Sequence, residues 1–293
     1  MQPIVIAEIG CNHKGDINIA KKMIQQAAFC GAQYAKFQKR CNRELLSEKE
    51  YNNPHPVPYN SYGETYGEHR EFLEFSIEQH AELKQHCENI GIGYACSVWD
   101  TTSAKEIAMG LNPDFIKIPS AMNMCMPIYE ALKGYGGRIH ISFGMTTHEE
   151  QARIIKELVL NFGFKKDNLV FYHCTSAYPA DFETLNLYEI DRMRKLYGDF
   201  KIGFSGHHKG IAVDVAAYTL GAKYIERHFT LDRTWKGTDH AASLEPGGLN
   251  KLVRDLEATH KALQYKTGVL PCETDQRKKL KKTELNQPVG ATA

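Results

Sequence analysis

The sequence lacks the features that mark several large classes of protein. No run of 18 apolar residues occurs, so no transmembrane helix is predicted. The opening residues, MQPIVIAEIG, pass directly into a strand pattern and lack the basic region and long apolar core of a secretory signal peptide. We therefore expect a cytoplasmic protein without a membrane partner.

Paired cysteines and a strong excess of charge are also missing. Eight cysteines occur, but none forms a CxxC pair, which argues against a zinc ribbon or a thioredoxin-like site. Several stand in apolar runs, which favours buried free thiols in a reducing compartment. Lys and Arg total 36 and Asp and Glu 35, a formal net charge of +1 with histidine neutral. This balance gives no electrostatic reason to expect nucleic acid as a partner.

What is present suits one large α/β domain. The chain has 293 residues, of which 42% are hydrophobic and 24% charged, enough for a full core. Short apolar runs, typical of strands buried on both faces, alternate with amphipathic segments. The predicted strands begin at Ile4, Tyr34, Gly93, Phe115, Arg138, Leu169, Lys201 and Lys223. The helices predicted between and after them are residues 17–30, 77–90, 101–109, 126–132, 148–162, 185–196, 211–220 and 249–265.

Eight strand–helix units in strict alternation predict a parallel sheet with right-handed crossovers. This number fits an α/β fold of the (β/α)8 TIM barrel type, with residues 1–268 as its single domain. The alternative is a doubly wound open sheet, but no GxGxxG follows the first strand. Residues 269–293 are polar and basic, and we expect them to form an extended tail.

One connection, residues 40–75, is much longer than the others and rich in Pro, Asn, Tyr and Gly. Loops of this length in compact barrels are usually functional or disordered. Because this one follows the second strand, it would lie over the C-terminal face of the barrel. We expect it to act as a lid or as a substrate-binding loop.

Two lysines stand inside apolar runs, Lys36 in YAKFQ and Lys117 in FIKI. Burying an unpaired ammonium group is costly. Five serines lie near the C-terminal ends of predicted strands, where barrel enzymes carry their chemistry: Ser97, Ser120, Ser142, Ser176 and Ser205. Together the two lysines and the hydroxyls would form a pocket for a phosphate and a carboxylate. Alternatively, each lysine reaches the rim or pairs with a local carboxylate such as Asp114.

Two histidines, His207 and His228, follow the seventh and eighth predicted strands, and barrel closure would bring Glu8 of the first strand beside them. Two imidazoles with open positions suit a divalent metal such as Mn, Fe or Co. The alternative is a pair of ordinary core or rim histidines, and we expect His208 at the rim. Asp239, in a Gly-rich turn after the eighth strand, either binds a sugar hydroxyl or caps the turn.

Seven motifs, in order, resemble those of the sialic acid synthase family, whose members condense phosphoenolpyruvate with an amino sugar. They are IAEIGCNHKGD, AKFQ, FIKIPS, HCTSAYP, FSGHH, YIERHFT and KGTDHAASLEP, and the similarity covers about residues 3–282. The resemblance implies a (β/α)8 barrel and a phosphoenolpyruvate-dependent synthase of the transferase class. The implied acceptor is of the N-acetylmannosamine type, and the implied product is a nine-carbon 3-deoxy-ulosonic acid.

The resemblance also implies the roles of individual residues. The metal ligands would be His207 and His228, with Mn or Mg as the usual ion. The catalytic positions fall on Glu8, Lys36, Lys117 and Glu226. The substrate positions fall on Gln38, Ser97, Ser120, Ser142, Ser176, Tyr178, Ser205 and Asp239. The metal would polarise the aldehyde, a glutamate would help to deprotonate the attacking water, and the lysines would stabilise the leaving phosphate.

Two departures from the family pattern concern specificity. In PSAMN, Met122 stands where the family usually has an acidic residue in the sugar site. Many members also carry a C-terminal antifreeze-like domain that lends an arginine to the sugar site of the partner in a homodimer. We expect a short form without it. Either a local residue (Arg43, His69 or Arg70) replaces that arginine, or the acceptor differs, or a separate chain supplies the domain. Two other functions stay open: a synthase of an eight- or seven-carbon ulosonate phosphate, and a non-catalytic phosphosugar-binding barrel.

Overall fold

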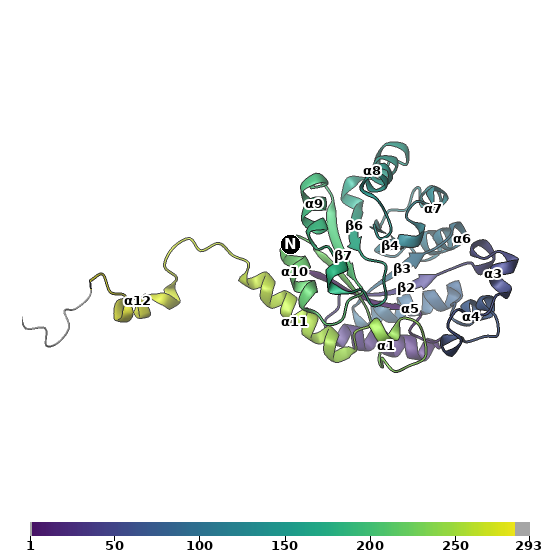
Figure 1. Ribbon diagram of the computed structural model, residues 1–293, viewed down its shortest axis with the longest axis horizontal. Helices are drawn as coiled ribbons and strands as arrows, with labels where there is room; N and C mark the ends of the chain where they lie inside the picture. Colours follow the sequence, from purple (N-terminus) through teal and green to yellow (C-terminus); the bar gives the residue numbers. More distant parts are fainter. Residues whose placement is uncertain (1, 285–293) are drawn as a thin grey trace, which may run out of the picture.

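The computed structural model describes residues 2–284 and is a closed barrel of eight parallel strands in sequence order (Figure 1). The barrel closes where β8 pairs with β1. The prediction of a single-domain (β/α)8 barrel is therefore confirmed. Seven strands begin at their predicted residue, and the last begins one residue later. They are β1 (Ile4–Gly10), β2 (Tyr34–Lys39), β3 (Gly93–Val98), β4 (Phe115–Ile118), β5 (Arg138–Ser142), β6 (Leu169–Cys174), β7 (Lys201–Gly206) and β8 (Tyr224–His228).

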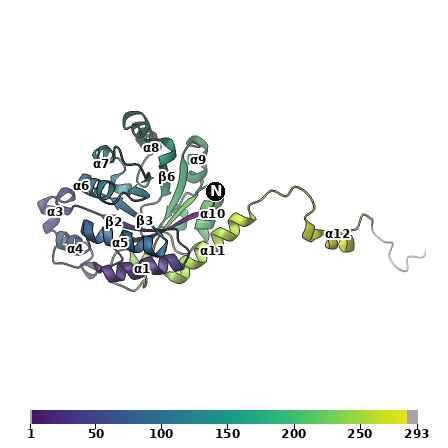
Figure 2. The same ribbon diagram turned by 180° about the vertical axis from the view of Figure 1, so that it is seen from behind.

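Helices lie around the outside of the barrel in both views (Figures 1 and 2). They are α1 (Ile17–Phe29), α5 (Ile77–Ile90), α6 (Thr101–Lys105), α7 (Met126–Ala131), α8 (His148–Lys156), α9 (Tyr188–Leu196), α10 (Ala212–Leu220) and α11 (Pro246–Ala262). The C-terminal turns of α6 and α8 widen into π-helical segments, η2 (Glu106–Leu111) and η4 (Glu157–Asn161).

α10 begins one residue later than predicted, and two other predicted helix starts are wrong by three residues, each for a local reason. α9 begins three residues later than predicted, because Asn186 adopts a left-handed backbone with φ 44° that a right-handed helix cannot contain. α11 begins three residues earlier than predicted, with Pro246 at its first position. The N–H groups of the first turn have no partner within a helix, so the N–H that proline lacks is not needed there. α5 begins at its predicted residue, where the Ser76 hydroxyl accepts from the N–H of Gln79 and caps the first turn.

The long connection after β2 folds into a set of short helices. It contains α2 (Asn42–Leu45), α3 (Glu48–Asn52), η1 (Pro58–Asn60) and α4 (Tyr66–Phe72). Capping boxes start α3 and α4, at Ser47 with Glu50 and at Thr65 with Glu68. We call residues 40–75 the β2 insert. It reaches the loop after β8, where the Tyr62 hydroxyl donates to the Lys236 carbonyl at 2.5 Å.

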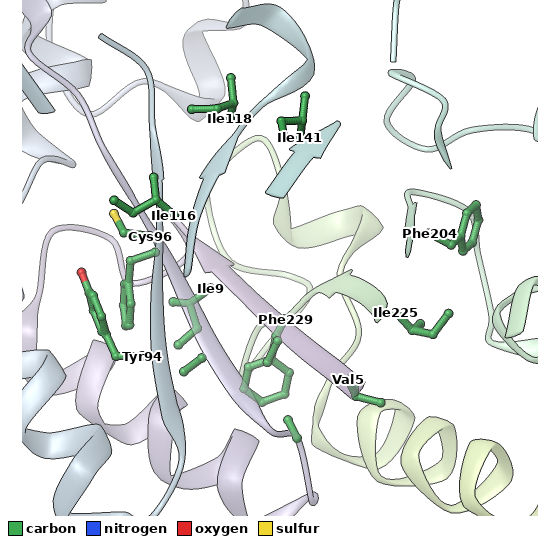
Figure 3. Packing of buried hydrophobic residues seen from close by; sticks show 14 of the residues in the cluster. Val5, Ile9, Tyr94, Cys96, Ile116, Ile118, Ile141, Phe204, Ile225 and Phe229 are labelled. Carbon is green, nitrogen blue, oxygen red and sulfur yellow. The ribbon is translucent and has the colours of Figure 1, made fainter. Parts of the chain in front are cut away.

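The hydrophobic core has two layers because every strand is buried on both faces. The larger layer fills the space between the strands and the helices, and Figure 3 shows members such as Val5 on β1, Ile116 on β4 and Ile225 on β8. The smaller layer lies inside the barrel and consists of Ile6, Ala95, Phe115, Val170, Tyr172 and Tyr224. His140 extends it by stacking on Phe115 with ring centroids 3.8 Å apart. This inner layer leaves room for a site at the C-terminal end of the strands.

The C-terminal segment leaves the barrel after α11. It contains η8 (Pro271–Glu273) and α12 (Thr274–Leu280), which bury no residues and lie away from the barrel in both views (Figures 1 and 2). The expected extended tail is therefore partly helical, and its residues 285–293 lie outside the described part. Among residues 2–284, no helix has both the length and the hydrophobicity needed to cross a bilayer. All eight cysteines are unpaired.

Candidate active site

A cavity of about 370 Å³ opens at the C-terminal end of the barrel. Its lining includes residues from all eight strands, among them Glu8 on β1 and Ser142 on β5. Every residue predicted for a catalytic, substrate or metal position lines this one cavity. The structure thus brings together side chains that are more than 200 positions apart in the sequence, such as Glu8 and Asp239.

Strand register sets the depth of the polar side chains in the cavity. Glu8 is paired with Lys36 on one side and with His228 on the other. Ser97 is paired with Lys117, and Ser205 with Glu226. Since side chains at paired positions of parallel strands point to the same face, these residues form one polar belt above the apolar floor.

Two lysines and two glutamates form a buried ion-pair network in the belt. Lys36 Nζ lies 2.5 Å from Glu8 Oε2 and 3.5 Å from Glu226 Oε1. Lys117 Nζ lies 2.6 Å from Glu226 Oε1. The lysines also donate to hydroxyls, Lys36 to Ser97 at 2.7 Å and Lys117 to Ser205 at 3.3 Å. The lysines therefore face the cavity, paired with its own carboxylates rather than with Asp114.

The charges of this network follow from its contacts. Burial raises the pKa of Glu226, but Lys117 and Lys36 outweigh that effect and lower this pKa to about 2. Burial lowers the pKa of Lys36, yet Glu226 and Glu8 raise it above the ordinary value. For Lys117, burial prevails over the attraction of Glu226, and its pKa is lowered. Glu226 and Lys36 are therefore charged at neutral pH.

Two serine hydroxyls of the cavity lie close against Gly144. A Cβ atom at this glycine would lie 2.4 Å from Ser176 Oγ and 2.5 Å from Ser120 Oγ, closer than any side chain can approach. Ser176 Oγ is buried and has no hydrogen-bond partner within the described chain. A buried hydroxyl without a partner is costly, and a bound anion would satisfy it. This arrangement is a cradle for phosphate or carboxylate oxygens.

The two cavity histidines can offer nitrogen atoms to a metal. Their ring centroids are 5.4 Å apart. The Nδ1–H of His207 donates to the Thr175 carbonyl at 2.8 Å, which leaves Nε2 with a free lone pair. His228 Nδ1 is buried without a hydrogen-bond partner, 3.6 Å from Asp239 Oδ2. Within residues 2–284, no His, Cys, Asp and Glu cluster of three or more suits a metal. The residues therefore fit a two-histidine site that leaves positions for water or substrate oxygens.

The two imidazoles differ in their protonation. Burial lowers the pKa of His228 despite the nearby Asp239, which keeps the ring neutral and suited to a metal. Burial also lowers the pKa of His207, but Cys174, whose Sγ is 3.9 Å from Nδ1, and the Thr175 carbonyl outweigh it. The pKa of His207 is thus raised, so a metal would have to compete with a proton there.

A second buried ionic cluster lies behind the histidines. Arg227 Nη1 is 2.5 Å from Asp214 Oδ2, and His208 Nε2 is 3.3 Å from the same oxygen. Arg227 Nη2 also donates to the His208 carbonyl at 2.6 Å. The prediction of His208 at the rim is wrong, because its side chain is fully buried. The cluster ties the loop after β7 to β8, the two segments that carry His207 and His228.

The β2 insert supplies part of the cavity wall. Of the three candidates for the missing arginine, His69 and Arg70 line the cavity, whereas the exposed Arg43 does not. Met122 ends a short 3-10 helix, η3 (Ser120–Met122), and packs against the outer core. Its neighbour Ala121 lines the cavity, and Met122 does not.

Several cavity residues escaped prediction: Cys11, Arg40, Leu73, Trp99, Pro119, Ala121, Met145, Cys174 and Thr238. A signal for two of them was present. Arg40 lies two residues beyond Gln38, and Trp99 lies two residues beyond Ser97. Because side chains alternate along a strand, this spacing continues the inward face past the strand end. Gln38 connects the polar belt to Arg40, since its amide nitrogen donates to Glu8 Oε1 at 2.6 Å and its amide oxygen accepts from Arg40.

Comparison with known proteins places this site in a family. Residues 23–268 match the NeuB family. The chain is 44% identical over 300 residues to N-acetylneuraminate-9-phosphate synthase of Mus musculus, covering 98% of this chain and 80% of the relative. It is 35% identical over 262 residues to N,N'-diacetyllegionaminic acid synthase of Campylobacter jejuni, covering 89% of this chain and 77% of the relative.

A solved structure gives the same result for the fold. The crystal structure of N-acetylneuraminic acid synthetase from Leptospira borgpetersenii, in complex with citrate, superposes with a TM-score of 0.79 at 29% identity. The match covers 96% of this chain and 93% of that one. The chain therefore belongs to the NeuB family, the sialic acid synthase family that its motifs predicted, and it is an enzyme of the synthase type.

Proposed function

We propose that this enzyme condenses phosphoenolpyruvate with an open-chain 2-acetamido sugar of the N-acetylmannosamine type. The products are a sialic-acid-type, nine-carbon 3-deoxy-ulosonic acid and inorganic phosphate. The observation that carries the proposal is the polar belt. Its two lysines, Lys36 and Lys117, donate to the hydroxyls of Ser97 and Ser205. The same cavity also holds His207, His228 and the Ser176 hydroxyl, which has no hydrogen-bond partner within the described chain. The names of the mouse and Campylobacter relatives support a product of this class.

Lys36 and Lys117 are proposed to bind the two anionic groups of phosphoenolpyruvate. The Gly144 cradle, with Ser120 and Ser176, adds hydroxyl donors for the same oxygens. C3 of phosphoenolpyruvate attacks the aldehyde carbon of the sugar, and positive charge develops at C2. Water adds at C2, and the tetrahedral intermediate expels phosphate by cleavage of its C–O bond. The ammonium groups stabilise the charge on the departing phosphate.

Glu8 and Glu226 are proposed to take the proton of the attacking water. Glu226 Oε2 is buried without a hydrogen-bond partner within the described chain, so it can accept from a water molecule in the cavity. Glu226 enters this role as a carboxylate, because Lys117 and Lys36 hold its pKa at about 2. Glu8 is held by Lys36 and Gln38 on the opposite side of the belt.

His207 and His228 are proposed to hold a divalent metal ion, Mn or Mg. When bound, this ion would polarise the aldehyde of the acceptor and make its carbon electrophilic. Gln38, Tyr178 and Asp239 are proposed to bind the hydroxyl groups of the sugar. Tyr178 lies over His207 with ring centroids 4.1 Å apart, which suits a wall of the acceptor site.

A cytoplasmic location and a homodimer complete the proposal. The homodimer rests on the family resemblance alone. Sedimentation of the purified protein tests it, and a single species with the mass of one chain would contradict it.

The direct test is an assay of phosphate release. The purified chain is incubated with phosphoenolpyruvate, Mn and a panel of aldoses, including 2-acetamido sugars, arabinose 5-phosphate and erythrose 4-phosphate. We expect phosphate release with a 2-acetamido sugar and a nine-carbon product in the mass spectrum. Release with only arabinose or erythrose phosphate would favour the shorter ulosonates. No release with any acceptor, together with metal-independent sugar binding in calorimetry, would favour the non-catalytic barrel.

The metal assignment has its own test. His207→Ala is expected to abolish metal-dependent turnover and to weaken Mn binding in calorimetry, while the circular dichroism spectrum stays unchanged. His148→Ala is the matched control, because His148 is exposed and does not line the cavity. Near-normal turnover in His207→Ala would remove the assignment.

A further inference from the structure

Two arginines at the mouth of the cavity have no role in the proposed reaction. Arg40 follows β2 and Arg70 lies on α4, and both line the cavity. Arg40 is 6% exposed, and the Nε atoms of both arginines are buried without a hydrogen-bond partner within the described chain. Unsatisfied guanidinium nitrogens next to a cavity point to a ligand that is not part of the protein.

The carboxylates near these arginines do not balance them. Arg40 Nη1 lies 3.3 Å from Glu74 Oε1, and the same carboxylate also accepts from the Arg40 backbone N–H. Within residues 2–284, Arg70 has no carboxylate oxygen within 4 Å, so one guanidinium remains without a counterion. Burial and the charge of Arg40 lower the pKa of Arg70, which reflects the same imbalance. An anion bound between the two would relieve it.

Trp99 holds the two guanidinium groups together. Arg40 Cζ lies 4.4 Å from the indole centroid and Arg70 Cζ lies 5.8 Å from it. The negative face of an indole attracts cations, which offsets part of the repulsion between the arginines. His69 adds a neutral neighbour, because burial and His55 lower its pKa to about 4. Its Nδ1 accepts from the Tyr62 N–H, so its proton is on Nε2.

The position along β2 separates these arginines from the lysine network. Lys36, Gln38 and Arg40 follow one another at every second residue on the inward face. At about 3.3 Å per residue, Arg40 starts roughly 13 Å farther out than Lys36. If phosphoenolpyruvate binds beside Lys36 and the sugar contacts Gln38, Arg40 lies next to the far end of the acceptor sugar.

We propose that Arg40 and Arg70 form a second anion subsite, which binds a phosphate group on the terminal carbon of a phosphorylated 2-acetamido sugar acceptor. The planar fork of an arginine matches phosphate oxygens in a bidentate manner, and two such forks can hold one phosphate. This subsite rests on the proposed function, because it selects among acceptors of the same reaction. It makes the enzyme a producer of a phosphorylated nine-carbon acid.

The test compares two acceptors in three proteins. Steady-state kinetics are measured with N-acetylmannosamine and with its 6-phosphate, for the wild type, Arg70→Gln and Arg43→Gln. We expect the wild type to have a kcat/KM about tenfold or more higher for the phosphorylated acceptor, as charged hydrogen bonds to phosphate predict. Arg70→Gln should lose about tenfold of that preference through KM for the phosphorylated acceptor, with KM for phosphoenolpyruvate unchanged.

The control and the contrary outcomes separate the possible causes. Arg43 lies on the same insert but outside the cavity, so Arg43→Gln should keep the wild-type preference. Equal losses on both acceptors in Arg70→Gln, or a wild-type preference for the unphosphorylated sugar, would overturn the subsite. If the wild type turns over neither acceptor, the proposed function fails. Calorimetry with N-acetylmannosamine 6-phosphate then tests the subsite by itself. If the subsite exists, the wild type binds this compound and Arg70→Gln does not.

Discussion

Gly144 shows at the scale of one residue how a missing side chain creates a binding site. Its Cα faces the hydroxyls of Ser120 and Ser176, and a methyl group there would overlap both. Gly144→Ala is therefore expected to raise KM for phosphoenolpyruvate by about tenfold or more, because the cradle closes and hydrogen bonds to a charged ligand are lost. Steady-state kinetics with phosphoenolpyruvate as the varied substrate measure the effect.

Gly136 provides the control for that prediction. A Cβ atom at Gly136 would meet nothing within 4 Å, so Gly136→Ala should leave KM for phosphoenolpyruvate unchanged. An unchanged KM in Gly144→Ala as well would show that the cradle binds no substrate oxygen.

Strand patterns predicted many of the residues that meet in the cavity, and the family motifs added loop residues such as Tyr178 and Asp239. Lys36 and Lys117 were recognisable because a charged residue interrupts an apolar run, and a barrel turns all such ends to one face. The contact of Arg70 with Trp99 was not predictable, because it depends on how the β2 insert folds back over the rim. The packing of Met122 against the outer core was not predictable either, because it depends on one turn of 3-10 helix after β4.

At the scale of elements, Glu44 connects the β2 insert to the barrel. Its carboxylate, on α2, accepts from the N–H groups of Thr101 at 3.0 Å and Thr102 at 3.1 Å, at the start of α6. Burial raises the pKa of Glu44, but hydrogen bonds from Thr101 and Thr102 outweigh it and lower this pKa to about 2. A depressed pKa means that the folded state prefers the carboxylate.

Glu44→Gln is expected to lower stability, with an effect that depends on pH. The contribution of the carboxylate is complete above the ordinary pKa of 4.5 and is lost as pH falls toward about 2. The difference in urea midpoint between wild type and variant should therefore be largest near neutral pH and should narrow below pH 4.5. A difference that is constant with pH would contradict the proposed role. Glu48→Gln, an exposed acid on α3, should change stability by less than about 0.5 kcal/mol.

The buried cluster behind β8 is expected to dominate the stability of that side of the barrel. Asp214→Asn leaves Arg227 charged, buried and without its partner, so we expect a loss of about 3 kcal/mol or more in the free energy of unfolding. Urea denaturation measures it. Asp191→Asn is the control, since Asp191 pairs with Lys195 at the surface and should matter by about 1 kcal/mol or less. Similar small losses in both variants would show that the cluster is not an anchor.

Elements were predictable where one local signal sufficed. The capping boxes of α3 and α4 are visible in the sequence as S-x-x-E and T-x-x-E, although the Pro and Gly content of the same insert is typical of a loop. The π-helical ends η2 and η4 carry no comparable signal. They depend on packing against neighbouring helices, which sequence periodicity does not contain.

For the whole molecule, the barrel is expected to fold without its C-terminal segment. Since η8 and α12 bury no residues, a chain ending at Gly268 should keep the circular dichroism spectrum and the thermal midpoint of the full chain. A chain ending at Glu245 is the contrasting variant, because it loses α11 and the buried Leu249, Leu252 and Leu256. It should fail to fold. A lower midpoint for the chain ending at Gly268 would contradict the boundary at residue 268.

The barrel itself was predictable because eight short apolar runs alternate with eight helices, and few folds satisfy that order. Closure of the barrel is a global property, and it alone brings Glu8 beside His228. The exact acceptor was not predictable in the same way. It depends on residues such as Arg70 and Ala121, whose roles follow from the fold of loops rather than from the barrel pattern.

The contact of Trp99 with Arg40 and Arg70 makes the fluorescence of this tryptophan sensitive to ligands. The chain has two tryptophans, of which Trp99 lines the cavity and Trp235 lies in the loop after β8 with Lys14 Nζ 4.4 Å from its ring centroid. A ligand that draws Arg40 or Arg70 away from Trp99 alters the electric field at that indole. The intrinsic fluorescence of Trp99 therefore reports whether a ligand occupies the cavity mouth. The Trp235→Phe variant removes the fluorescence of the other tryptophan.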